Sequence, residues 1–271
     1  DEYITMQNNG TTHGMQIANG DWRGYQPTSY FTELGGGMCF VQHPLRKAGK
    51  PIRAAVLGMG IGTLACHGND GDLIRFFEIN PDVVRLANDP RYFTFLSRSS
   101  AKIEVVTDDA RKALEREEAA GETEYDLLVV DVFSGDSIPP HLATREAIAL
   151  YLGRLKEDGI LAFHVTNWHL DLFPIMKAIG REFSLETLGV ANEAVNNAYV
   201  SFWTYFSRKP AGFALDEKWQ FVIDYGPVKD IPLMTDEFHP MVPHLAVRAA
   251  DRLVLHRPDL TGLSPQDRAM R

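Results

Sequence analysis

The residues of this chain that could do chemistry follow a series of short apolar runs. Successive runs are followed by Gly58, Gly60 and Gly62, then Glu78, then Asp108 and Asp109, then Asp131 and Asp136, and finally His164 and Asn167. Glycines after a strand let the backbone approach a ligand closely and direct amide N–H groups toward it. A carboxylate after the second strand can accept hydrogen bonds from both hydroxyls of a ribose. Together these residues predict a nucleoside site.

The spacing of the glycines indicates which kind of nucleoside ligand is bound. In a dinucleotide fingerprint the third glycine lies five residues after the first, whereas in "AAVLGMGIGTLA" that position is Thr63 and the glycine comes one residue earlier. This spacing favours a ligand without a pyrophosphate, although Glu78 itself suits nicotinamide and adenosyl ligands alike. Asp108 can then accept a hydrogen bond from an adenine amino group, as adenosyl sulfonium sites require.

Each of these residues also has a purely structural interpretation. The glycines permit close packing of a helix against a strand, and Asp108 can cap the helix that begins "DARKAL". Asp109 suits a structural role better than Asp108, because a negative charge in the first turn matches the helix dipole. The series as a whole favours ligand binding. We therefore assign to the nucleoside Gly58, Gly60, Gly62, Glu78, Asp108 and Asp109.

The elements that must position these residues alternate between strands and helices from residue 51 onward. Apolar segments predict strands at 53–57, 73–79, 102–107, 126–132, 159–165 and 199–207, and helical patterns fall at 61–68, 81–88, 109–119, 143–156 and 169–183. Apolar strands with little polar alternation, separated by helices, indicate a doubly wound α/β domain with a mostly parallel sheet. The ligand should lie outside the carboxyl ends of the strands.

Residues 1–50 are predicted to form a small separate module. The stretch "YITMQNNGTTHGMQI" predicts a β-hairpin that turns at Asn8-Asn9-Gly10, and "PTSYFTEL" predicts a helix before a flexible Gly35-Gly36-Gly37. The domain of residues 51–271 follows and ends in a Pro-rich tail. In "MTDEFHP", Asp236 and Glu237 predict a capped helix start rather than a pocket lid.

Composition and charge bear on the partners and the setting of the chain. The formal net charge of -9 opposes binding to a nucleic-acid backbone and is compatible with a cationic small substrate. No apolar run approaches a membrane span and no leader opens the chain, which predicts a soluble segment, and the missing initial Met suggests a piece of a longer protein. Cys39 and Cys66 lack a CxxC spacing and a histidine array, so we expect a reduced, cytoplasmic setting and no metal.

The stretch "YDLLVVDVFSGDSIPPHLATREAIALYLGRLKEDGILAFHVTNWHLDL", residues 125–172, resembles the polyamine aminopropyltransferases, the spermidine synthase family. The resemblance extends from the hairpin to about residue 180. It implies a Rossmann-like class I methyltransferase fold, decarboxylated S-adenosylmethionine as cosubstrate, an amine acceptor and a homodimer formed through the hairpin. The family's Gly-rich loop matches Gly58 to Gly62, its ribose-binding Glu matches Glu78, its adenine-binding Asp matches Asp108, and its catalytic Asp matches Asp131. The family's hairpin element "DGxxQ" matches "NGTTH", and its helix tyrosine matches Tyr30.

The chain departs from the family at residues that would hold the substrates. Ile61 lies where the family has an Asp for the cosubstrate's ammonium, and Ser134 lies at its second Asp, with Asp136 the nearest carboxylate. His13 and His164 lie at Gln positions. The stretch "DVFSGDSIPPHLATREA" looks more like the synthase-like domains at the ends of bacterial multi-pass membrane proteins. This similarity implies a membrane segment upstream and a domain at the cytoplasmic face of the membrane.

The reaction that the resemblance implies is attack by an amine on a carbon next to a sulfonium, with release of methylthioadenosine. We expect Asp131 to accept the proton of the amine, since a bare carboxylate after "LLVV" is poorly explained by packing. Asp136 and Tyr30 are expected to hold the amine, although Asp136 also suits a turn. His13, Ser134 and His164 are assigned to the acceptor. A neutral imidazole can itself act as the base, and the two histidines suit a substrate less cationic than a diamine, or a structural role.

Two other functions stay open at this point. Ile61 removes a reason to prefer the decarboxylated cosubstrate, so the first alternative is a methyltransferase that uses S-adenosylmethionine itself. Such an enzyme must satisfy the cosubstrate's carboxylate, and "GMGIGTLA" offers no Arg or Lys for this, although backbone amides can serve. The second alternative is a catalytically idle nucleoside-binding domain that serves a membrane partner, which the presence of Asp131 opposes.

Overall fold

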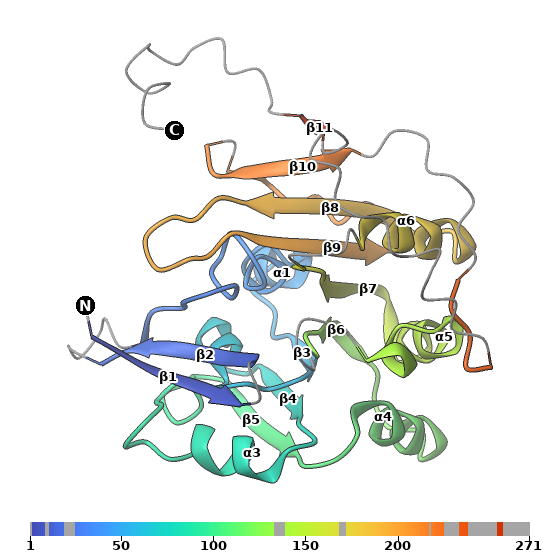
Figure 1. Cartoon of the computed structure of the whole chain (residues 1–271). Helices are drawn as coiled ribbons and strands as arrows, with labels where there is room; N and C mark the ends of the chain where they lie inside the picture. Colours follow the sequence, from blue (N-terminus) through green and yellow to red (C-terminus); the bar gives the residue numbers. More distant parts are fainter. Residues whose placement is uncertain are drawn as a thin grey trace, which may run out of the picture.

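A computed structural model describes residues 2–8, 11–18, 25–132, 139–167, 172–216, 218–224, 233–237 and 254–256. Among these residues, nine strands form one mixed sheet in the order β11-β10-β8-β9-β7-β6-β3-β4-β5. A separate two-stranded sheet contains β1 and β2. Figure 1 shows the large sheet as the centre of the molecule, with helices α4, α5 and α6 gathered on one side of it.

One half of the large sheet is parallel. It contains β7 (Leu155–His164), β6 (Tyr125–Val130), β3 (Arg53–Leu57), β4 (Leu73–Phe77) and β5 (Lys102–Val106). All residues of β6 are buried, because the strand is covered on both faces, and this double burial explains its unbroken apolar pattern. The predicted doubly wound, mostly parallel sheet with a Rossmann-like class I methyltransferase fold is confirmed.

The other half of the sheet is antiparallel. It contains β9 (Ser201–Ser207), β8 (Glu186–Asn192), β10 (Gln220–Asp224) and β11 (Val254–His256). The sequence predicts β9 from its aromatic run but does not predict the other three. The sequence of β8, "ETLGVAN", has polar residues at both ends and Gly189 in its middle. It is a strand because it pairs with β9 and β10, and its own propensity gives little sign of this.

Of the longer helices, α5 packs against β7 and α6 packs against β8 and β9. The longer helices are α3 (Pro81–Ala87), α4 (Ala110–Ala119), α5 (Arg145–Gly153) and α6 (Phe173–Glu182). The side chains of Asn80, Asp109 and Thr144 each accept a hydrogen bond from a first-turn backbone N–H, which defines three of the four starts. The corresponding predicted helices are confirmed with shorter ends. In the described part of the chain, none of the helices combines the length and the apolar character needed to cross a membrane.

Two predicted helices are wrong. Residues 61–68 contain only a short 3-10 helix, η2 (Thr63–His67), because Gly62 before it has a left-handed φ of 78° that no α-helix can include. Residues 27–34 form turns, since Ser29 has a φ of 59° and forms a bridge to Ala198 instead of bonding along its own chain. The short helices α1 (Met38–Val41) and α2 (Pro44–Lys47) form where none is predicted, and η3 (Pro140–Leu142) precedes α5. The glycines at 35–37, predicted to be flexible, are buried.

The N-terminal hairpin packs on the loop that follows β3 (Figure 1). Its strands β1 (Tyr3–Asn8) and β2 (Thr11–Ile17) pair antiparallel with an irregularity at Met6 and Gln7, which confirms the predicted hairpin. Residues 9 and 10 of its turn lie outside the described residues. Met6 belongs to the same core cluster as Met59 and Ile61, so the hairpin shares apolar packing with the glycine loop.

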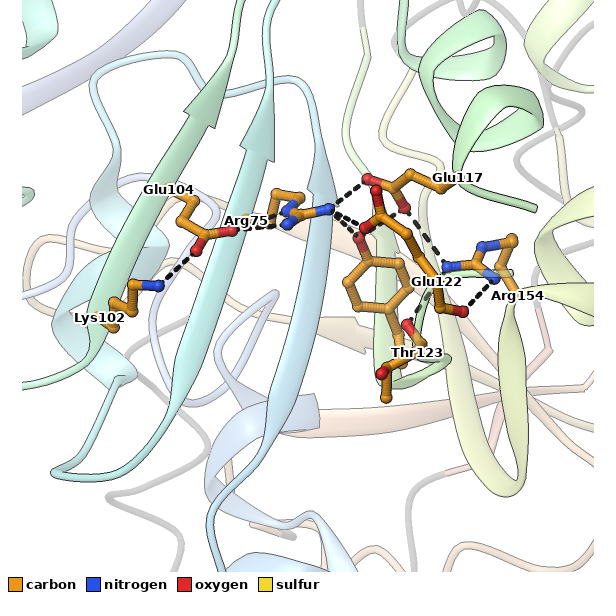
Figure 2. A network of polar contacts seen from close by, with 8 residues as sticks. Arg75, Lys102, Glu104, Glu117, Glu122, Thr123 and Arg154 are labelled. Carbon is orange, nitrogen blue, oxygen red and sulfur yellow. Dashed lines mark hydrogen bonds and ion pairs between the residues drawn. The ribbon is translucent and has the colours of Figure 1, made fainter. Parts of the chain in front are cut away.

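A network of polar contacts connects β4, β5 and α4 (Figure 2). Arg75 in β4 lies 2.8 Å from a carboxylate oxygen of Glu104 in β5 and 2.6 Å from one of Glu117 in α4. The Tyr125 hydroxyl donates to Glu117 at 2.7 Å, and Arg154 lies 3.5 Å from the same carboxylate oxygen. We call these five residues the Arg75 network. It connects the sheet to α4 through ion pairs and the Tyr125 hydrogen bond.

Candidate active site

Asp131 and His164 meet at the carboxyl edge of the parallel strands. Asp131 directly follows β6, and its backbone N–H donates to the Leu57 carbonyl at 2.8 Å, while His164 ends the neighbouring strand β7. Nδ1 of His164 lies 2.6 Å from Oδ1 of Asp131. His164 is 4% exposed, and the Asp131 side chain is 14% exposed. Asp131, the predicted base, and His164, which is predicted to bind the acceptor substrate, are therefore hydrogen-bonded to each other.

The His164 ring is fixed on several sides. Its plane stacks on Trp203 with ring centroids 4.5 Å apart, and Tyr30 lies 5.0 Å away at a tilt. Nε2 of His164 lies 2.6 Å from the Thr166 hydroxyl. The ring of Tyr30 also meets Tyr199 edge-on at 5.6 Å. Tyr30, predicted to hold the amine, therefore lies beside the Asp131–His164 pair.

The glycine loop approaches both Asp131 and the hairpin. Gly58, Gly60 and Gly62 all have left-handed backbone conformations. A Cβ at Gly58 would collide with the carbonyl oxygen of Asp131, and one at Gly60 would collide with that of His13. Close packing within the protein is thus enough to explain why these two positions are glycine. Their role in nucleoside binding stays a prediction, supported by the position of the loop at the carboxyl edge.

Glu78 follows β4 at the same edge and is 8% exposed. Its Oε2 accepts the Met59 N–H at 3.2 Å and its Oε1 accepts the Asn80 N–H at 2.9 Å. These bonds fix the carboxylate and leave other lone pairs for a ribose. The next residue, Ile79, is 68% exposed, more than any other large apolar residue among those described. Ile79 is not among the residues predicted from the sequence, although an apolar side chain directly after a carboxylate suited to a ribose is a signal that the sequence contains.

Asp108 and Asp109 have different tasks in the structure. Asp109 is the N-cap of α4 and accepts the Lys112 N–H at 3.0 Å, as its structural interpretation predicted. Asp108 accepts the Asp109 N–H at 2.7 Å and forms an ion pair with Arg116. These contacts, the backbone N–H first, lower the pKa of Asp108, so it is ionised at neutral pH. Binding of the nucleoside by either residue stays a prediction.

His13 reaches the site from the hairpin. Its carbonyl oxygen accepts the Ile61 N–H at 3.1 Å, which joins β2 to the glycine loop. Burial lowers the pKa of His13, and the nearby charges of Glu78 and Asp131 oppose this only in part. His13 is therefore a neutral imidazole close to both carboxylates. The sequence predicts that His13 binds the acceptor substrate, and the structure brings it to the predicted site.

Ile61 faces the hairpin. It is 1% exposed, and a Cβ on Gly14 would lie 2.7 Å from its Cγ1. The residue that replaces the family's loop carboxylate thus serves to dock β2 onto the loop.

Several residues that the sequence singles out lie away from the Asp131–His164 pair or outside the described residues. Ser134 and Asp136 fall in the segment 133–138, which lies outside the described residues. Asp236 accepts hydrogen bonds from Arg111 at 2.7 Å and from the Thr144 hydroxyl at 2.8 Å, so it contacts α4 and the start of α5. The helix that it was expected to cap would begin outside the described residues. Across the described ranges, no group of three or more His, Cys, Asp or Glu is arranged to hold a metal ion.

Sequence similarity connects the chain to two kinds of transferase. It is 35% identical over 127 residues to an N-terminal histidine N-methyltransferase from Emericella nidulans, which covers 45% of this chain and 21% of that protein. It is 33% identical over 118 residues to a polyamine aminopropyltransferase from Vibrio vulnificus, which covers 41% of this chain and 37% of that protein. The chain thus spans well under half the length of these relatives. No family model matches it.

Two solved structures that are similar to part of the chain carry names of the same two kinds. A probable spermidine synthase from Corynebacterium glutamicum is 20% identical, with a TM-score of 0.49 over 76% of this chain and 77% of that one. Human methyltransferase-like protein 13, in complex with SAH, is 17% identical, with a TM-score of 0.49 over 66% of this chain and 82% of that one.

Proposed function

We propose that the chain is a transferase that moves an alkyl group from an S-adenosyl sulfonium to a nitrogen nucleophile, with Asp131 as proton acceptor. The observation that carries this proposal is the Asp131 carboxylate at the carboxyl edge, bonded to His164 and adjoining the glycine loop. Within the described ranges, Asp131 forms no ion pair with a Lys or Arg. In these ranges, therefore, no Lys or Arg side chain competes with a substrate for the Asp131 carboxylate.

The cosubstrate is assigned to the edge formed by β3, β4 and β5. Glu78 would accept the ribose hydroxyls, because its carboxylate is already fixed by two backbone N–H groups. The exposed side chain of Ile79 would cover one face of the adenine and gain by burial of its apolar surface. Asp108, ionised and half-exposed, would accept the adenine amino group. Both relatives carry names of transferases, which supports this ligand class.

The reaction needs an unprotonated nitrogen in line with the reacting carbon. The nitrogen lone pair forms a bond to the carbon next to the sulfonium, and the carbon–sulfur bond breaks to leave a neutral thioether. The nitrogen gives up one proton, which Asp131 accepts. Holding the nucleophile against a carboxylate therefore serves both alignment and deprotonation.

Aminopropyl transfer to an amine such as putrescine is the first candidate. The residues that resemble the polyamine aminopropyltransferases include the hairpin, Glu78, Asp108 and Asp131, and the 33% identical relative carries that name. Decarboxylated S-adenosylmethionine would be the cosubstrate. Methylthioadenosine would be the product that leaves.

Methyl transfer is the second candidate, and Ile61 is the observation that favours it. This side chain is buried against Gly14, so the loop offers no carboxylate to the ammonium of an aminopropyl group. The 35% identical relative is named for N-methylation of an N-terminal histidine. S-adenosylmethionine would then be the cosubstrate and S-adenosylhomocysteine the product.

One experiment separates these candidates. The protein is incubated with each sulfonium compound and with diamines, monoamines or a peptide that begins with histidine, and the products are followed by mass spectrometry. Acceptor-dependent methylthioadenosine supports aminopropyl transfer, and acceptor-dependent S-adenosylhomocysteine supports methyl transfer. Asp131→Asn serves as the blank. Calorimetric binding of methylthioadenosine and S-adenosylhomocysteine without turnover of any acceptor would overturn the proposal in favour of an idle nucleoside-binding domain.

A further inference from the structure

We infer that His164 is a positioning residue, a neutral imidazole with its proton on Nδ1 that orients the Asp131 carboxylate. This inference rests on the proposed function, because it assigns how the proton acceptor of that reaction is held. Hydrogen bonds connect four groups in series: the Phe202 amide, the Thr166 hydroxyl, the His164 ring and the Asp131 carboxylate.

The Phe202 amide sets the donor-to-acceptor direction of this series of hydrogen bonds. The Phe202 N–H can only donate, and it donates to the Thr166 hydroxyl oxygen at 2.9 Å. The hydroxyl proton can then go to Nε2 of His164 at 2.6 Å or to the Phe202 carbonyl at 3.5 Å. If Nε2 were the donor, the hydroxyl proton would have only the long 3.5 Å contact to the Phe202 carbonyl, so we infer that Thr166 donates to Nε2.

The tautomer of His164 follows from this direction. If Nε2 accepts a hydrogen bond, the ring proton of a neutral imidazole must lie on Nδ1. Nδ1 then donates to Oδ1 of Asp131 at 2.6 Å. A doubly protonated ring would force the Thr166 hydroxyl toward the long 3.5 Å contact and would place an imidazolium against the carboxylate. The arrangement thus favours an ionised Asp131 beside a neutral donor.

Packing limits other orientations of the ring. Trp203 stacks on it and Tyr30 lies against it, and the residue is buried. Both ring nitrogens already contact protein groups, so His164 acts on the nucleophile through Asp131. Because Oδ1 accepts the hydrogen bond from Nδ1–H, Oδ2 is the oxygen assigned to the nitrogen of the substrate. The Asp131 carboxylate would thereby be held in one orientation before the substrates bind.

The tautomer is tested without any substrate. In protein labelled with 15N-histidine, NMR at neutral pH should show His164 as the Nδ1–H tautomer, identified by the loss of its signals in His164→Asn. Asp131→Asn should move the Nδ1 proton signal upfield, because a neutral amide is a weaker acceptor than a carboxylate. Thr166→Val should allow both tautomers. An Nε2–H tautomer or an imidazolium in the unmodified protein would overturn the inference.

The positioning role is tested by kinetics with the sulfonium and acceptor that the unmodified protein turns over. His164→Leu should lower kcat by about 10- to 100-fold with little change in the cosubstrate KM, as for the hydrogen-bond partners of metal ligands. His164→Asn keeps an N–H donor near Nδ1 and should recover most of this loss. An unchanged kcat in His164→Leu, or an equal loss in both variants, would overturn the inference.

A matched control comes from another buried histidine. His43 contacts the Asp126 carbonyl at 3.1 Å and lies away from the carboxyl edge. His43→Asn should leave kcat per folded molecule unchanged, whatever it does to stability. If no acceptor is ever alkylated, the proposed function fails while the NMR result still decides the tautomer, so the two failures are distinguishable.

Discussion

The Arg75 network and the carboxyl edge of the sheet contain the same kinds of acidic residue in opposite settings. In the network, Glu117 lies between Arg75 and Arg154 and also accepts the Tyr125 hydroxyl (Figure 2). At the carboxyl edge, Glu78 accepts hydrogen bonds from two backbone N–H groups, and Asp131 is hydrogen-bonded to the His164 imidazole. In the described part of the chain, neither of these two carboxylates pairs with a Lys or Arg.

This difference separates stability from ligand binding. A carboxylate that already faces guanidinium groups gains little from another cation, and removing its partner leaves a buried charge that is costly. A carboxylate without such a partner keeps a negative potential that attracts cations. Sulfonium and ammonium groups are both cations. The network should therefore determine how stable the fold is, whereas Glu78 and Asp131 should determine what binds and how fast it reacts.

The largest expected effect comes from Asp131→Asn. The amide has the shape of the carboxylate but cannot accept the proton, so turnover should fall by about 10³-fold, within the usual range of general base catalysis. Nucleoside affinity measured by calorimetry should change by less than about tenfold. Circular dichroism should show an unchanged unfolding midpoint. Turnover above half of the original value would place the proton acceptor elsewhere.

Arg154→Met should have the largest effect on stability. Arg154 is 3% exposed and faces Glu117, so its removal should lower the free energy of unfolding by about 3 kcal/mol, measured by urea denaturation. Activity per folded molecule should not change. Arg85→Met is the control, because the Arg85–Asp82 pair is exposed and such pairs contribute little. Equal losses in the two variants would contradict a structural role for the network.

The stability of the protein should also fall at mildly acid pH. Burial lowers the pKa of His13, His43 and His67 below the ordinary value of 6.5. Below pH 6.5 the unfolded chain binds protons at these rings and the folded chain does not, so stability is complete above that pH and decreases as pH falls through 6. Thermal unfolding at pH 7.5 and 5.5 measures the effect. An equal midpoint at both values would show that the rings become protonated in the folded state.

The smallest expected effect distinguishes the two contacts of Asp108. Asp108→Ala should weaken methylthioadenosine binding by about tenfold, as expected for loss of one hydrogen bond. Arg116→Ala removes only an exposed ion-pair partner and should change the affinity by less than about twofold. Calorimetry measures both. Equal effects of the two substitutions would mean that Asp108 serves its ion pair rather than the adenine.

Much of the candidate site could be predicted from spacing along the chain. Glu78, Asp131 and His164 each end an apolar run, and parallel strands bring their carboxyl ends to one edge. The roles of neighbouring residues were harder to predict. Asp109 and Asp108 are adjacent and chemically equal, and only the start of α4 decides which of them is the cap.

The sequence by itself determined the alternation of strands and helices, the double burial of β6 and the presence of acidic residues at the strand ends. These features depend on local periodicity and burial, which a chain carries in the order of its residues. Only the tertiary structure decided that His164 bonds to Asp131, that Ile61 packs under Gly14 and that β8 is a strand. Each of these joins segments distant in sequence, and such contacts depend on which strands become neighbours.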